Sequence, residues 1–140
     1  SVLVERFREF ARGQKQNFEW TLQSVGRHVR ESDRYDMVVI TRHDIIWKKP
    51  IVEWQSLDPG KFNFASPCQG WRTVNDILHT MPGHMLSTFL DKPYWTHFDY
   101  DKAIKEYGKV GVEVGFALAD SAEKMGGGVV RSENPWYEIY

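Results

Sequence analysis

Apolar residues recur every three to five positions over the first part of the chain. Between residues 2 and 29 this spacing follows the period of an amphipathic helix, and Gly13 interrupts it. The pattern changes at Met37–Ile40, where four apolar residues follow one another without alternation. Such a run is typical of a strand that is covered on both faces, as in the parallel sheets of α/β proteins. The pattern therefore predicts one or two helices followed by a buried strand.

Shorter patterned segments alternate with turn-rich ones in the remaining residues. A helix is expected to begin at Thr73 and to continue to Met81. The other predicted elements are a short strand at Lys61–Ala65, helical turns at Leu86–Leu90, a helix capped by Asp99 or Asp101 that carries apolar residues to Val114, and extended segments at Val129–Val130 and Trp136–Tyr140. Together these elements predict an α/β fold, a three-layer sandwich with a small, mainly parallel sheet.

The composition fits a single domain over residues 1–140. Of the 140 residues 41% are hydrophobic and 26% are charged, which excludes a disordered or collagen-like chain. A net charge of -1 gives no general attraction to nucleic acid, and no run of about twenty apolar residues predicts a membrane span. Because Cys68 is the one cysteine, an internal disulfide and a cysteine-based zinc site are also excluded.

Polar residues with chemical potential directly follow the predicted buried strand. In an open α/β sheet, ligands bind beyond the carboxyl ends of the strands, and this strand delivers Arg42, His43 and Asp44 to that place. Arg42 suits a phosphate, because its planar guanidinium makes two charge-assisted hydrogen bonds to one oxyanion. Asp44 suits a hard divalent cation or a sugar hydroxyl. The alternative is an Arg42–Asp44 ion pair that closes the strand and leaves His43 exposed.

Other candidate residues have a functional and a structural interpretation. Asp76 is a candidate for a functional role, but the dipole of the predicted helix by itself also favours a carboxylate in the first turn. His79 and His84 are five positions apart, which does not suit a metal pair on a helix, so we expect capping or surface residues. Trp71 and Trp95 lie in turn-rich stretches and are candidates for stacking on a sugar or for contact with a partner chain.

Three sequence segments carry a resemblance to a known family. The segment YDMVVITRHDIIW, Tyr35 to Trp47, resembles the core of nucleotide-sugar glycosyltransferases with the GT-A fold. QNFEWTLQ before it and TVNDILHTMPGHM after it are similar to the flanking segments in an uncharacterised eukaryotic group of glycosyltransferase-like proteins. The resemblance covers about residues 13–90. It implies a GT-A or Rossmann-like fold, transfer of a sugar from a nucleotide-sugar to the hydroxyl of an acceptor such as a glycan, and a secretory-pathway location.

The resemblance also implies roles for individual residues. Arg42, Asp44 and Asn75 would bind the donor. Asp44 would in addition hold a Mn²⁺ or Mg²⁺ ion at the donor diphosphate. Asp76 would orient the sugar or act as the catalytic base.

Two departures from the GT-A pattern favour a second hypothesis. Arg42 stands where these enzymes carry the first carboxylate of their Asp-x-Asp motif. They also place a nucleotide-binding strand before the first helix, and this chain is expected to lack that strand, which would make the fold partial. The alternative function is a non-catalytic, glycosyltransferase-derived structural or assembly subunit that binds other protein chains.

Overall fold

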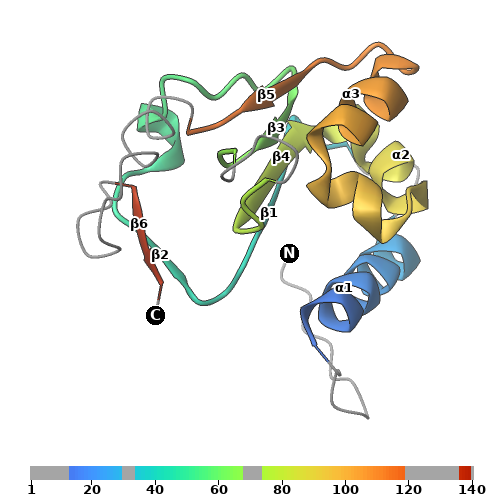
Figure 1. Ribbon diagram of the computed structural model, residues 1–140, viewed down its shortest axis with the longest axis horizontal. Helices are drawn as coiled ribbons and strands as arrows, with labels where there is room; N and C mark the ends of the chain where they lie inside the picture. Colours follow the sequence, from blue (N-terminus) through green and yellow to red (C-terminus); the bar gives the residue numbers. More distant parts are fainter. Residues whose placement is uncertain (1–12, 30–33, 68–73, 119–135, 140) are drawn as a thin grey trace.

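A computed structural model describes residues 13–29, 34–67, 74–118 and 136–139 of the chain (Figure 1). It has a mixed α/β fold with a small mixed sheet. The main elements are α1 (Gln14–His28), β1 (Met37–Thr41), β2 (Ile45–Trp47), β3 (Phe62–Phe64), β4 (Leu78–Pro82), α2 (Leu86–Asp91), α3 (Tyr100–Gly108), β5 (Val114–Phe116) and β6 (Tyr137–Ile139). Three short 3₁₀ helices, Ile51–Glu53, Gly83–Met85 and Tyr94–Phe98, connect these elements.

The central sheet has the strand order β1-β4-β3-β5. β4 pairs antiparallel with both β1 and β3, and only the β3–β5 pair is parallel. The prediction of a mainly parallel sheet is therefore wrong. A separate two-stranded sheet joins β2 and β6 in antiparallel register, with Ile46 opposite Glu138.

The α-helices α1, α2 and α3 lie on one side of the central sheet, whereas the 3₁₀ helix Ile51–Glu53 lies on the other side, near β2 and β6 (Figure 1). Within the described ranges no α-helix covers the opposite face, so the predicted three-layer sandwich is not the arrangement of these residues. The strand at Met37–Ile40 is confirmed, but not its burial on both faces. β1 is an edge strand that pairs antiparallel with β4, and Val39 is 42% exposed. An antiparallel strand needs only one face packed on the core, and its other face can contact solvent.

The helix predicted from Thr73 to Met81 is wrong in its described part. The chain forms β4 instead, and all five residues of this strand are buried. The apolar spacing of the segment matches a helix, but β4 is the central strand that β1 and β3 flank on both edges. Pairing on both edges and burial outweigh a weak local preference.

Two hydrophobic clusters stabilise the two sides of the fold. The cluster between the helices and the sheet consists of Phe62, Phe64, Val74, Met81, Met85, Leu86, Phe89, Ala103, Tyr107 and Val112. The second cluster consists of Trp54, Ala65, Ile77, Leu78, Ala117, Leu118, Trp136 and Tyr137. Phe18 and Leu22 pack α1 against the first cluster, which fixes this helix beside the carboxyl end of β1.

Most of the other predicted elements are confirmed. α1 follows the helical spacing after Gly13, β3 lies inside the predicted strand, and α2 and β6 lie in their predicted segments. Asp99 caps α3, since its carboxylate accepts a hydrogen bond of 2.9 Å from the backbone N–H of Lys102. This helix ends at Gly108, and Val114 begins β5. The predictions for residues 2–12 and Val129–Val130 lie outside the described residues.

Gly83 provides a sharp test of the packing between β4 and the segment before β1. A Cβ atom at Gly83 would lie 1.7 Å from the backbone oxygen of Tyr35. We expect Gly83→Ala to lower the free energy of unfolding by about 1–3 kcal/mol, because backbone must move to admit the methyl group. Urea denaturation measures this effect. The matched control is Gly26→Ala in α1, where nothing lies within 4 Å of the added atom, and which should be neutral or stabilising. Equal destabilisation of both variants would contradict the close approach.

Candidate functional site

A pocket of about 620 Å³ lies between α1 and the ends of two neighbouring strands. Its volume falls in the range of pockets that bind small molecules. Its lining residues are Gly13, Gln14, Asn17, Phe18 and Thr21 on the α1 side, Ile40, Thr41, Arg42, His43 and Asp44 at the end of β1, and Asp76 and His79 at the start of β4. The pocket therefore combines polar side chains with a few apolar ones.

The antiparallel pairing of β1 with β4 brings the two halves of the site together. Thr41, the last residue of β1, is opposite Leu78, the first residue of β4. The Thr41 hydroxyl donates to the Ile77 carbonyl at 2.9 Å, and the Arg42 backbone N–H donates to the same oxygen at 3.4 Å. As a result, Asp76 lies beside Arg42, although 34 positions separate them in the sequence.

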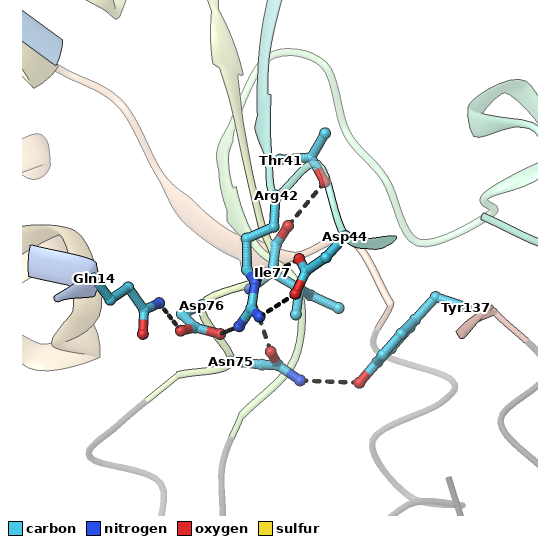
Figure 2. Close-up of polar contacts among 8 residues, drawn as sticks. All are labelled: Gln14, Thr41, Arg42, Asp44, Asn75, Asp76, Ile77 and Tyr137. Carbon is cyan, nitrogen blue, oxygen red and sulfur yellow. Dashed lines mark hydrogen bonds and ion pairs between the residues drawn. The ribbon is translucent and has the colours of Figure 1, made fainter. Parts of the chain in front are cut away.

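Arg42 is held between two carboxylates (Figure 2). Its Nε and Nη2 donate to the two oxygens of Asp44 at 2.9 and 2.5 Å, and Nη1 donates to Asp76 Oδ1 at 3.4 Å. The Gln14 amide donates to the other oxygen of Asp76. A guanidinium has five N–H donors, so two remain for a ligand. The side chains of Arg42, Asp44 and Asp76 are 37%, 27% and 30% exposed, which leaves the cluster within reach of a ligand.

This cluster shifts the pKa values of its members. The hydrogen bonds from Arg42 lower the pKa of Asp44, and its positive charge acts in the same direction. The hydrogen bond to Asp44 raises the pKa of Arg42 in return. All of these effects favour the charged forms, so that Arg42 and Asp44 form an ion pair at neutral pH.

The Arg42–Asp44 ion pair has a direct test. Arg42→Gln should raise the pKa of Asp44 toward its ordinary value, because the principal hydrogen-bond donor is lost. Carbon-13 NMR titration of the aspartate carboxyl groups measures this change. Lys105→Gln on the exposed face of α3 serves as the control and should leave the Asp44 titration in place. An unchanged Asp44 titration in Arg42→Gln would contradict the pairing.

Asn75 lies next to this cluster, but its side chain bonds elsewhere (Figure 2). Its amide donates to the Tyr137 hydroxyl at 3.1 Å, and its Oδ1 accepts the Ile77 backbone N–H at 3.3 Å. These bonds connect the turn before β4 to β6. The structure thus brings Arg42, Asp44 and Asp76 together at the pocket, whereas Asn75 faces the second sheet.

The side chains of this cluster, in the arrangement observed, do not suit a divalent cation. Both oxygens of Asp44 already accept from the Arg42 guanidinium, which stands where a cation would bind. Within the described ranges, no group of three or more histidine, cysteine, aspartate or glutamate side chains is placed to hold a metal ion.

Comparison with known proteins gives no match. No family model matches the chain, and neither a curated protein nor a solved structure is significantly similar to it. The function must therefore be argued from the site itself. In the described part of the chain, no helix is both long and apolar enough to cross a bilayer.

Several residues of the pocket were not identified from the sequence. Gln14, Phe18 and Thr21 are not among the predicted site residues, although Phe18 and Thr21 belong to the QNFEWTLQ segment, and only the docking of α1 brings them to the ends of the strands. His79 was expected to be a capping or surface residue, but it is 1% exposed. Its place in the central strand explains this difference, while His84 is exposed as expected. Trp71 and the side chain of Trp95 lie outside the described residues.

Proposed function

We propose that this chain is a glycosyltransferase-like domain whose pocket binds the sugar of a nucleotide-sugar. The observation that carries this proposal is the position of Arg42 between Asp44 and Asp76 at the edge of the pocket. Carboxylates accept hydrogen bonds from sugar hydroxyls, and the two remaining guanidinium N–H groups can donate to ligand oxygens. Phe18 adds an apolar ring to the opposite wall.

The net charge of the cluster indicates which part of the donor it contacts most. This part is the sugar rather than the diphosphate. One guanidinium between two carboxylates leaves a formal charge of -1 on these three residues. A diphosphate alone would meet no excess of positive charge there. Sugar hydroxyls, which are neutral and both donate and accept hydrogen bonds, suit such a mixed cluster better.

In the proposed reaction, Asp76 is the group that would accept the proton. The hydroxyl of the acceptor attacks the anomeric carbon of the sugar, and its proton passes to a carboxylate oxygen of Asp76. The bond between that carbon and the diphosphate oxygen breaks, and its electron pair leaves with the diphosphate. Arg42 would donate hydrogen bonds to the charge that develops on this leaving group. Gln14 and Arg42 already hold the Asp76 carboxylate in place.

A thermal-shift screen tests this proposal. The panel contains UDP-glucose, UDP-N-acetylglucosamine and GDP-mannose, each with and without Mn²⁺, and UDP, GDP and glucose as partial ligands. We expect at least one nucleotide-sugar to raise the melting temperature, and to do so without Mn²⁺. Failure of every donor with folded protein would overturn the proposal. Stabilisation only in the presence of Mn²⁺ would show that a cation replaces Arg42 at Asp44, contrary to the proposed arrangement.

The second candidate function is a non-catalytic structural or assembly subunit. The observation in its favour is the same ion-pair cluster, because three of the five Arg42 donors already bond within the chain. In this case Arg42 would only connect the ends of β1 and β4. No nucleotide-sugar would then raise the melting temperature of the protein. The Arg42→Met variant would have a lower melting temperature than the wild type.

A further inference from the structure

His79 is a buried titratable residue that the proposed reaction does not use. It lies on β4, three positions after Asp76, and lines the same pocket. Only 1% of its surface is exposed. Its ring is surrounded by five phenylalanine rings whose centroids lie 5.2–5.9 Å away, those of Phe18, Phe62, Phe64, Phe89 and Phe98. A polar ring in such an apolar environment is costly unless its nitrogens have partners.

One nitrogen of this ring has its proton fixed by a hydrogen bond. His79 Nε2 lies 2.6 Å from the backbone carbonyl oxygen of His97. A carbonyl oxygen can only accept, so Nε2 must carry the hydrogen. Burial lowers the pKa of His79 to about 4, which keeps the ring neutral at pH 7. In this tautomer Nδ1 has a lone pair and no hydrogen.

The exposed part of His79 includes this second nitrogen. Among the described residues, the buried side-chain nitrogen and oxygen atoms that lack a partner are Asn63 Oδ1 and His97 Nε2. No described residue bonds His79 Nδ1 either, yet this atom is not one of the buried ones. It therefore retains contact with solvent, and the pocket is the cavity that His79 lines.

We propose that His79 Nδ1 is a ligand-binding acceptor in the floor of the pocket and selects a ligand that presents a hydroxyl donor at this point. The inference rests on the proposed function, since it names which part of the nucleotide-sugar reaches the floor. Asp76 and His79 then act as two neighbouring acceptors, and Arg42 acts as the donor. Such a site discriminates against a deoxy-sugar, because the bound ligand would cover Nδ1 without giving it a hydrogen-bond donor.

Two variants test the roles of the two ring nitrogens of His79 separately. His79→Gln places an amide near Nε2, so it can still donate to the His97 carbonyl but has no acceptor at the position of Nδ1. His79→Asn places its amide oxygen near Nδ1, so it keeps the acceptor and loses the donor. We expect His79→Gln to bind the sugar about tenfold more weakly, and His79→Asn to retain more of the affinity. A purely structural role, which acts through the Nε2 bond to the His97 carbonyl, would give the reverse order, with His79→Asn as the weaker binder.

Nitrogen-15 NMR of the histidine rings is the decisive experiment, because it needs no variant. In the free protein at pH 7, Nδ1 of His79 should be unprotonated. Its resonance should shift when UDP-glucose, UDP-N-acetylglucosamine or GDP-mannose is added, and should not shift with UDP or GDP alone. A protonated Nδ1 in the free protein would overturn the inference whatever the function of the chain.

The remaining outcomes distinguish this inference from the proposed function. If a nucleotide-sugar binds, but Nδ1 does not shift and His79→Gln keeps full affinity, the inference fails and the proposed function stands. If free glucose or mannose shifts Nδ1 while no nucleotide-sugar does, the acceptor role is supported and the donor assignment fails. If none of these compounds binds, both fail.

Discussion

Acidification from pH 7 to about pH 4.5 is expected to lower the free energy of unfolding by roughly 4 kcal/mol, about 2 kcal/mol from each of two buried histidines. Burial lowers the pKa of His79 to about 4 and that of His97 to about 3. Both side chains are 0–1% exposed. In the unfolded chain they take up protons near pH 6.5, whereas in the folded protein they stay neutral to much lower pH. Between these values the unfolded state binds more protons, so stability falls as pH falls.

Urea denaturation at a series of pH values measures this dependence. In His97→Phe, which keeps an aromatic ring in contact with Phe89, the slope of stability against pH should fall to about half, whatever the stability of the variant at pH 7. His84→Gln, which changes an exposed histidine, serves as the control for the substitution itself. Equal slopes in the wild type and in His97→Phe would show that His97 is not held neutral by burial.

Asp44→Asn is expected to weaken nucleotide-sugar binding by at least about tenfold, which corresponds to about 1.4 kcal/mol. The carboxylate of Asp44 accepts two hydrogen bonds from Arg42 and fixes the plane of the guanidinium. An asparagine amide presents one oxygen and one N–H₂ group, so one of its two ends faces the guanidinium donors without an acceptor. Arg42 would lose its orientation toward the pocket as well as its charge partner.

Titration calorimetry with the nucleotide-sugar that stabilises the wild type measures this effect. Asp91→Asn removes an exposed carboxylate at the end of α2 and is the matched control, with the affinity of the wild type. Unfolding curves at pH 7 confirm that both variants fold. An Asp44→Asn variant with the wild-type dissociation constant would show that this carboxylate does not belong to the binding site.

Local signals in the sequence predict several elements well. The helical spacing after Gly13, the apolar run of β1 and the Asp99 cap of α3 depend on nearby residues alone, and the structure has these elements. β4 is different, because strands from distant parts of the chain specify it on both edges. Its apolar residues also fit a helix, so the local pattern pointed to the wrong structure. The prediction of a mainly parallel sheet has a different origin, the unbroken apolar run of β1, which is an edge strand with Val39 exposed.

The site divides in a similar way. Arg42 and Asp44 were found because they directly follow a recognisable strand, and the ion pair between them was one of the two interpretations. The contact of Asp76 with Arg42 depends on the antiparallel pairing of β1 with β4, which the sequence did not reveal. The α1 side of the pocket depends on the docking of this helix against the sheet. The tautomer of His79 depends on its hydrogen bond to the His97 carbonyl, and both are tertiary features.

The most direct test of the central claim maps the binding surface by ¹H–¹⁵N NMR. The ligand is the nucleotide-sugar that gives the largest thermal shift. We expect the perturbed resonances to concentrate at Gln14 and Asn17 of α1, at Thr41 to Asp44, and around Asp76 and His79. Perturbations that cluster elsewhere, or none at saturating concentrations of every donor in the panel, would contradict the claim that this pocket binds a nucleotide-sugar.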